Sequence, residues 1–441
     1  MTLALRLAKQ GKGVTLFEAA PTLGGLASAW QLGDVVWDKH YHVTLFSDSF
    51  VRVLLQELGL EHQMRWSKTR TAFYADGSLH SLSNVAEFIK FPLLNLVDKV
   101  RLGATILRAS RIKNSQSLEA IRVRDWLKKW SGSRTTEKIW LPLLRAKLGS
   151  SYEETSAAFI WASVARMYAA RRTRSKTELF GYLPGGYARF IERLAEVLKF
   201  EHVDCELGRP VKEIAGTADG KVEVRVEGDG VRTFDEVVVT VPVPQAMRMC
   251  PHLTEAEKNQ WGQIQYQGII CASLLLKNSL SDFYITNITD ENLPYTAVIE
   301  MSALVDKAQF NGRALVYLPK YLSPDSPDFA LSDAEIQERF LAGLEKMYPS
   351  FRRDDVLCFQ ISRVKYLLPI PTLNYSEKLP SATTSIPGLH IVNSAHIVNG
   401  TLNVNETVQL AEATAKRFAS KAASAALAAQ VIEHEFAQAH S

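Results

Sequence analysis

The sequence is short of cysteine pairs, long apolar runs and net charge, and each shortage excludes a kind of protein. The four cysteines, at positions 205, 250, 271 and 358, are far apart and form no Cys-x-x-Cys pair, which excludes a redox dithiol and a cysteine-based zinc site. No run reaches the roughly 18 apolar residues of a membrane span, and the N-terminus has no hydrophobic signal segment. A net charge of +4 over 441 residues gives no basis for binding nucleic acid. We therefore expect a cytoplasmic protein without a metal site.

The stretch nearest to a membrane span is Phe88 to Leu107. Its charged residues are Lys90, Asp98, Lys99 and Arg101. This pattern is typical of an amphipathic helix, which we expect to pack on the protein, with peripheral contact to a lipid surface as the open alternative.

A basic cluster stands further along the chain and comprises Arg171, Arg172, Arg174 and Lys176. We expect a solvated loop or helix end there. The alternative is a contact with an anionic ligand or a membrane surface.

The N-terminal residues contain half of a dinucleotide-binding unit. An amphipathic helix over 2–10 is followed by the apolar strand Val14–Phe17, then Glu18 and the pair Gly24-Gly25. A carboxylate at the end of such a strand accepts hydrogen bonds from ribose hydroxyls, and paired glycines let the backbone approach a pyrophosphate closely. The strand and Gly-x-Gly-x-x-Gly loop that open a Rossmann unit are lacking before Thr2. We expect Met1 to be an internal methionine, with about ten to twenty residues missing before it.

The rest of the chain alternates between helical and strand patterns. A helix is expected over 49–58, a hairpin around Asp76-Gly77 and only helices from Val85 to about Met167. Three short strands follow over 210–243, and further strands of a mixed sheet over 269–276, 296–301 and 314–318. Ser332 and Glu335 form the capping box of a helix that reaches Pro349. A buried strand over 388–397 and a long Ala-rich helix close the pattern.

Several of these segments resemble the flavin-containing amine oxidase superfamily, which includes protoporphyrinogen oxidases, phytoene desaturases and UDP-galactopyranose mutases. The segments that carry the resemblance are Glu18 with Gly24-Gly25, VVWDKHYHVT, WLPLLRAKLG, GYLPGGYARFIERLAE, ELGRPVKEI, FDEVVVTVPV, and GLHIVNSAHI with NVNETVQLAEATA. The resemblance implies an α/β fold. It has an FAD-binding Rossmann-type domain of the glutathione-reductase kind, a mixed-sheet substrate domain and a helical insertion.

The resemblance also implies domain boundaries. The FAD-binding domain would comprise 1–84, 181–245 and 386–430, with the helical substrate or cap region at 85–180. The substrate-domain sheet would occupy 246–385, and 431–441 would be a tail.

FAD is the implied cofactor, and the resemblance assigns residues to it. The N-terminus of the last helix would point at the flavin, and the backbone of Val211 would contact the adenine. The implied cofactor-binding residues are Glu18, Gly24, Gly25, Leu26, Ala27, Val211, Ser394, Asn403, Asn405 and Glu406. Two positions depart from the family pattern: Leu26 replaces a basic residue, and Asn393–His396 replaces an expected acidic residue.

His40 and His42 are the candidate catalytic residues. They flank Tyr41 on a strand expected over 35–42, so both imidazoles would lie on one face. One interpretation places them near the flavin or the substrate, as a proton relay or as hydrogen-bond donors. The other is a strand-edge pair with ordinary structural partners.

The expected function is FAD-dependent oxidation, with a hydride passing from a substrate carbon to the flavin. The substrate would be a small molecule that is bulky, lipid-like or a sugar nucleotide. Two alternatives stay open: a non-redox flavoenzyme of the UDP-galactopyranose mutase type, and a truncated flavin-free protein that only binds its partners.

Overall fold

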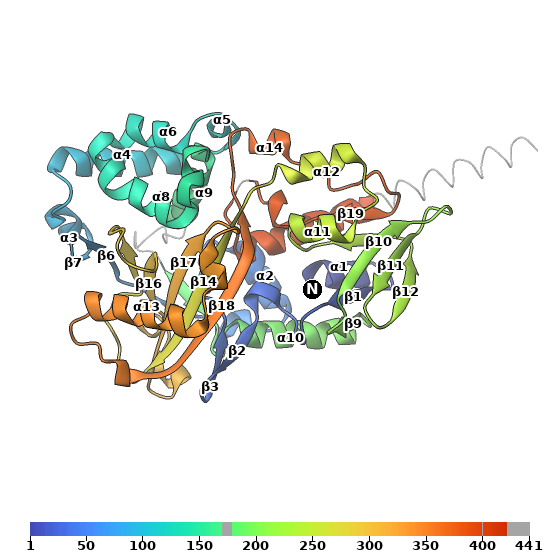
Figure 1. The fold of residues 1–441 in the computed structure, drawn as a ribbon, viewed down its shortest axis with the longest axis horizontal. Coiled ribbons are helices and arrows are strands. Elements are labelled where there is room, and N and C mark those ends of the chain that lie inside the picture. Colours follow the sequence, from blue (N-terminus) through green and yellow to red (C-terminus); the bar gives the residue numbers. More distant parts are fainter. Residues whose placement is uncertain (170–178, 399, 421–441) are drawn as a thin grey trace, which may run out of the picture.

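The computed structural model describes residues 1–169, 179–398 and 400–420, and its elements form three regions (Figure 1). Parallel strand pairs with flanking helices make up the first region. The second is a seven-stranded mixed sheet, and a helical layer over one end of that sheet is the third. The predicted α/β class, with a Rossmann-type domain, a mixed sheet and a helical insertion, is confirmed. The basic cluster at 171–176 and the tail at 431–441 lie outside the described residues.

The Rossmann-type region contains two parallel pairs of strands. β1 (Thr15–Glu18) pairs with β9 (Asp204–Leu207), and β13 (Val237–Val239) pairs with β19 (Leu389–Ile391). Three helices enclose one core cluster beside β1: α1 (Thr2–Lys9), α2 (Ser49–Glu57) and α10 (Gly186–Phe200). The last helix, 404–420, adds Val404 and Val408 to the same cluster.

Small antiparallel units complete this region. β10 (Val211–Gly216), β11 (Val222–Val226) and β12 (Gly230–Phe234) form one sheet that packs with β13 and β19. α11 (Val243–Met249) and α12 (Glu255–Gly262) cover the same core cluster. β2 (Ala29–Leu32) pairs with β3 (Val35–Asp38). β8 (Phe180–Tyr182) lies between β4 (Thr44–Leu45) and β5 (Arg65–Ser67).

The mixed sheet has the order β18-β14-β17-β16-β15-β6-β7. Its strands are β18 (Val356–Pro369), β14 (Tyr266–Leu276), β17 (Ala314–Leu322), β16 (Ala297–Glu300), β15 (Ile285–Ile288), β6 (Thr71–Ala75) and β7 (Ser78–Ser81). All 11 residues of β14 are buried, because α13 (Asp333–Met347) covers one face and residues from β3 and β4 pack against the other. The β6–β7 hairpin, expected with residues 1–84 in the cofactor domain, extends this sheet instead.

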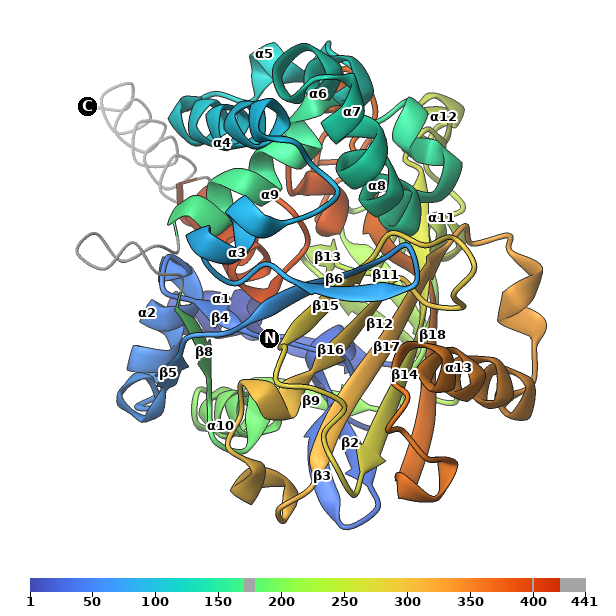
Figure 2. The same cartoon turned by 90° about the vertical axis from the view of Figure 1, so that its left-hand side faces the viewer.

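The helical layer extends from residue 85 to residue 169, as the sequence predicted. It comprises α3 (Val85–Lys90), α4 (Leu96–Arg111), α5 (Gln116–Glu119), α6 (Val123–Ser131), α7 (Ser133–Thr135), α8 (Leu141–Leu148) and α9 (Ala157–Ala169). Figure 2 shows this layer above the sheet, with α3 and α4 at its edge. The stretch 88–107 is therefore two helices, since Pro92 follows α3 and Asn95 forms a capping box with Asp98 at the start of α4. Among the described ranges, no helix has the length and apolarity needed to cross a bilayer.

Candidate cofactor and substrate site

A tight turn follows β1, where the glycine pair was expected to meet a pyrophosphate. Gly24 has a φ of 109° and Gly25 a φ of 54°, and Gly25 opens the short helix η1 (Gly25–Ala27). A Cβ on Gly24 would lie 3.3 Å from the side chain of Ile191, whereas a Cβ on Gly25 would meet no atom within 4 Å. Gly24 therefore packs against α10. The backbone of Gly25 is not covered by any side chain, and the space beside it is open. Leu26 and Ala27 belong to the same turn.

Glu18 and Val211 lie at one edge of the Rossmann-type region. Glu18 ends β1, and one of its carboxylate oxygens accepts a hydrogen bond from the backbone N–H of Ala20 at 2.8 Å. Its carbonyl oxygen accepts a hydrogen bond from the N–H of Arg209, two residues before β10 begins at Val211. The second oxygen of this carboxylate has no hydrogen bond to the described part of the protein.

His40 is bound to the glycine turn. Its Nδ1 lies 3.2 Å from the carbonyl oxygen of Leu26. Burial lowers the pKa of the imidazole to about 4, so the ring is neutral near pH 7. Because a carbonyl only accepts, Nδ1 carries the proton and Nε2 is left with a free lone pair. This Nε2 is buried and has no partner among the described residues.

The expectation that both histidines lie on one strand was wrong. β3 ends at Asp38, and residues 39–43 continue as irregular chain, with the two imidazole centroids 6.5 Å apart. The strand ends where its partner runs out, since Asp38 pairs with Ala29, the first residue of β2. The buried carboxylate of Asp38 accepts a hydrogen bond from the N–H of Tyr187 at the start of α10. Burial raises the pKa of Asp38. The Nδ1 of His42 lies 3.7 Å from the same carboxylate.

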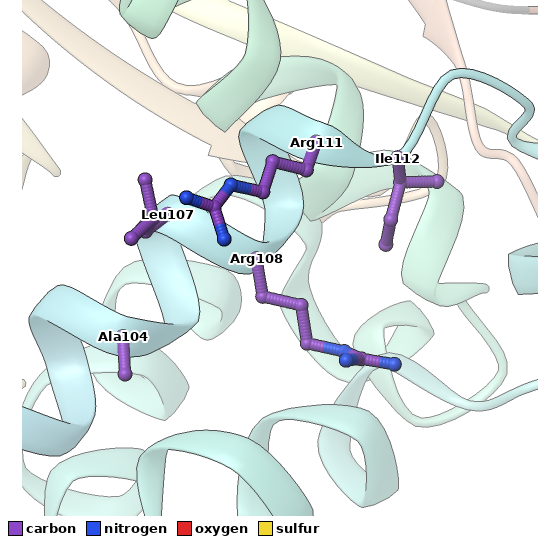
Figure 3. Close-up of a pocket in the computed structure, with 5 residues that line it drawn as sticks. All are labelled: Ala104, Leu107, Arg108, Arg111 and Ile112. Atoms are coloured by element: carbon purple, nitrogen blue, oxygen red, sulfur yellow. The ribbon is translucent and has the colours of Figure 1, made fainter.

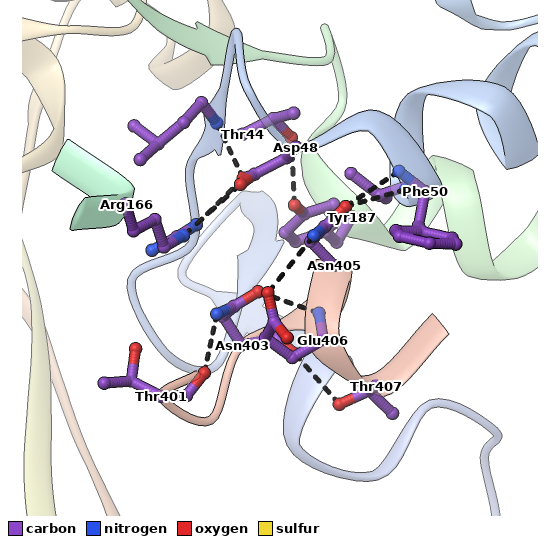
Figure 4. A network of polar contacts seen from close by, with 12 residues as sticks. Thr44, Asp48, Phe50, Arg166, Tyr187, Thr401, Asn403, Asn405, Glu406 and Thr407 are labelled. Atoms are coloured by element: carbon purple, nitrogen blue, oxygen red, sulfur yellow. Dashed lines mark hydrogen bonds and ion pairs between the residues drawn. The ribbon is translucent and has the colours of Figure 1, made fainter. Parts of the chain in front are cut away.

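A group of polar contacts lies between Tyr187 and the last helix (Figure 4). The imidazole of His42 meets the ring of Tyr187 edge-on, with centroids 5.1 Å apart. The hydroxyl of Tyr187 is hydrogen-bonded to the Thr44 hydroxyl at 3.0 Å. Arg166, on α9 of the helical layer, donates to the buried carboxylate of Asp48 at 2.8 Å. The helical layer is thereby held against the start of α2, where Asp48 is the N-cap residue.

The expected flavin-facing residues of the last helix have partners of their own. Asn403 caps this helix, since its Oδ1 accepts a hydrogen bond from the N–H of Glu406 at 3.1 Å. Asn405 accepts hydrogen bonds from the N–H groups of Phe50 and Val51 and so holds the start of α2. Glu406 is partly buried, which raises its pKa, with Arg166 acting in the opposite direction. Their contact with a cofactor stays a prediction.

Ser394 lies apart from this network, just beyond β19. It interacts with the hydroxyl of Tyr266, which also accepts a hydrogen bond from the N–H of Val243. The preceding Asn393 donates to the carbonyl oxygen of Val241, after β13. Ser394 thus marks the carboxyl ends of the second parallel pair, where ligands bind in open α/β sheets.

A group of side chains that sequence reasoning missed lies where the mixed sheet meets the helical layer. The hydroxyls of Tyr41 and Tyr321 are 2.6 Å apart, and the hydroxyl of Tyr317 donates to the carbonyl oxygen of Asp38. The ammonium of Lys147, on α8, lies 5.7 Å from the ring centroid of Tyr321 and 5.8 Å from that of Phe159. Burial lowers the pKa of Lys147. No local motif identifies these residues, because their partners are distant in sequence.

The comparisons with known proteins agree with this architecture. A zeta-carotene desaturase from Synechocystis sp. is 23% identical over 405 residues, covering 79% of this chain and 81% of that protein. A solved structure of a protein assigned as a protoporphyrinogen oxidase, from Exiguobacterium sp. 255-15, has a TM-score of 0.73 at 19% identity and covers 95% of this chain and 96% of that one. A reduced UDP-galactopyranose mutase has a TM-score of 0.64 at 15% identity, over 86% of this chain and 83% of that one. The family model described as "Flavin containing amine oxidoreductase" matches residues 1–417, and the chain therefore belongs to that family of flavin-dependent oxidoreductases.

Proposed function

We propose that this protein is an FAD-dependent oxidoreductase that removes a hydride from a carbon of a bulky, mainly apolar small molecule. When bound, FAD would supply the hydride acceptor. Glu18 would hold a ribose through its free carboxylate oxygen, and Gly25 would admit the pyrophosphate to the bare backbone. The segment at Val211 would meet the adenine, and Ser394 would lie along the middle of the cofactor.

One observation carries the cofactor proposal: the buried lone pair on His40 Nε2 beside the glycine turn. A buried acceptor without a partner costs free energy that a bound donor would recover. The turn fixes the imidazole by its other nitrogen, so Nε2 points in one defined direction. An N–H or O–H group of the flavin or its ribityl chain fits this acceptor. We assign His40 to holding the cofactor, and not to moving a proton, because its pKa of about 4 keeps it neutral.

The substrate would lie between the mixed sheet and the helical layer. Tyr41, Tyr321 and Phe159 offer aromatic faces there, and Lys147 is the nearby cation. Such a surface favours an extended apolar molecule, and the relatives include a protein named for a carotene. His42, beside Asp38 and Tyr187, would orient the reacting end of the substrate.

The cofactor is tested by purifying the protein and recording its visible absorbance. We expect the two-banded spectrum of an oxidised flavin, and release of FAD, not FMN, on heat denaturation. A protein that carries no flavin and binds none when FAD is added would overturn the proposal.

The reaction is tested by mixing the flavin-loaded protein with candidate substrates without oxygen. Bleaching of the flavin bands by an apolar polyene, with no bleaching by a polyamine, would support the proposed substrate class. Turnover of a sugar nucleotide that requires reduced flavin and consumes no oxidant would favour the mutase alternative, for which the similar mutase fold is the supporting observation.

A further inference from the structure

Helix α4 packs on the protein through one face, as expected, but its outer face is apolar and exposed. Leu96, Val97 and Val100 expose 70%, 65% and 66% of their surfaces, more than most large apolar side chains in the protein. Ala104 and Leu107 are exposed further along the helix. The spacing of these residues places all of them within one arc of about 100°.

The opposite face of α4 attaches the helix to the rest of the protein. Asp98, Leu102, Thr105 and Ala109 are buried there, and α4 packs on α6 and α9 of the helical layer. The exposed arc is therefore not needed to attach α4 to the protein. Ile89, 58% exposed on α3, extends the apolar surface toward the preceding helix. We call these exposed residues (Ile89, Leu96, Val97, Val100, Ala104 and Leu107) the outer apolar face.

Cations surround the outer apolar face, and the carboxylates of this segment are already engaged. Glu87 accepts hydrogen bonds from Ser81 and Ser83, and Asp98 belongs to the capping box of α4 and lies near Arg134. Within residues 85–112 the cations are Lys90, Lys99, Arg101, Arg108 and Arg111.

The arginines at the end of α4 lie beside its apolar residues. Figure 3 shows the guanidinium of Arg111 extending back toward Leu107, with Arg108 directed to the flank of the helix. The guanidinium of Arg108 stacks on the ring of Trp130, 3.7 Å from its centroid. Long cationic side chains of this kind lie along apolar surface and still reach phosphate groups.

We propose that the outer apolar face docks on the surface of a lipid bilayer that carries anionic headgroups. Aliphatic side chains on one arc of a helix, flanked by lysine and arginine, are the features of helices that lie in the membrane interface. The aliphatic groups would enter the boundary between headgroups and acyl chains, and the cations would contact the lipid phosphates. A second copy of this chain fits the face less well, because it would bring a second row of cations against the first.

Figure 1 places α3 and α4 at the end of the helical layer farthest from β1 and β9. Docking would therefore leave the Rossmann-type region in water. The proposal does not depend on the flavin chemistry, since a protein without flavin presents the same face.

The test is flotation of the full chain with vesicles of phosphatidylcholine, alone or mixed with phosphatidylglycerol. We expect binding to the anionic vesicles, weaker binding to the neutral ones, and loss at high salt because the charges are screened. The double variant Val97→Asp, Val100→Asp should lower the bound fraction on the order of tenfold or more. Replacing Lys90 and Arg111 by Gln should weaken binding to anionic vesicles only.

The matched control is Val53→Asp, on the exposed face of α2, where Val53 is 60% exposed. It should bind vesicles like the unchanged protein. Circular dichroism of each variant checks that the fold is intact, which is expected because the changed side chains are exposed. Failure of the unchanged protein to float with anionic vesicles would overturn the proposal. So would a self-association in solution that Val97→Asp, Val100→Asp abolishes, since the face would then belong to a second copy.

Discussion

The guanidinium of Arg166 and the carboxylate of Asp48 form an ion pair of 2.8 Å that joins the helical layer to the Rossmann-type region. The Asp48 side chain is almost fully buried and the Arg166 side chain is three-quarters buried. The same carboxylate accepts a hydrogen bond from the N–H of Leu45. The pair therefore links two regions that are distant in sequence.

Replacing Asp48 by Ala should destabilise the protein by about 2 to 3 kcal/mol, because it leaves a largely buried arginine unpaired. Chemical denaturation followed by circular dichroism measures the change. Glu255→Ala is the control, since Glu255 pairs with Lys258 on an exposed helix and should cost less than about 1 kcal/mol. Equal losses in the two variants would contradict a structural role for the buried pair.

Two substitutions of His40 test the contributions of its two ring nitrogens to FAD binding separately. Asn places an amide near the position of Nδ1 and keeps the donor to Leu26, whereas Gln places an amide near Nε2. If Nε2 meets the cofactor, His40→Asn should weaken FAD binding on the order of tenfold, and His40→Gln should weaken it less. Quenching of flavin fluorescence gives the dissociation constant. The reverse order would show that the bond to the glycine turn matters more than Nε2.

Glu300 should make the stability depend on pH. Burial raises the pKa of its carboxyl to about 7, although it accepts hydrogen bonds from the N–H groups of Leu280 and Ser281. The unfolded chain releases this proton near pH 4.5, so the fold loses stability as the pH rises from there to about 7 and loses no more above it.

In Glu300→Gln the amide oxygen can accept the two N–H groups and the amide nitrogen can donate to Ser302. We expect this variant to gain about 2 to 3 kcal/mol over the unchanged protein at about pH 8, and little at about pH 5. Urea denaturation at the two pH values makes the comparison. A gain that is the same at both would show that the carboxyl does not titrate in this range.

The thiols should differ in reactivity. Cys250 and Cys271 are fully buried, and burial raises the pKa of Cys250 to about 12, so neither forms a thiolate near pH 7. Cys205 and Cys358 are partly exposed. An aromatic disulfide reagent should therefore modify no more than two thiols in the native protein and all four after denaturation. Rapid reaction at Cys250 would contradict the packing around it.

The sequence predicted elements whose signals are local. The capping box at Ser332 and Glu335 starts α13 as expected, and Asp76 and Gly77 adopt the positive φ angles that their hairpin requires. β18 was missed although apolar and polar residues alternate from Phe359 to Tyr366, because the alternation is interrupted at Ser362 and Arg363. In the structure it pairs with the buried β14 at one edge of the mixed sheet.

The candidate site was predictable only in part. His40 and His42 were identified, but their assignment to a strand failed because β3 loses its partner at Asp38, opposite the first residue of β2. The N–H of Tyr187 that binds the Asp38 carboxylate lies 149 positions away in the sequence. No sequence pattern identified Arg166 or Lys147 as part of the site. Their partners, Asp48 and Tyr321, are distant in sequence and become neighbours only in the folded protein.

The parallel pairing of β6 with β15 has a consequence for how the protein is made. This pairing sets Thr71 beside Ile285, so the hairpin at 71–81 leaves the ribosome long before its partner strand exists. The helices of 85–169 depend on local contacts and can form in the meantime. The mixed sheet is complete only after β14 to β18 have been synthesised. Until β15 has been synthesised, β6 presents an unpaired edge, and unpaired strand edges favour aggregation of a nascent chain.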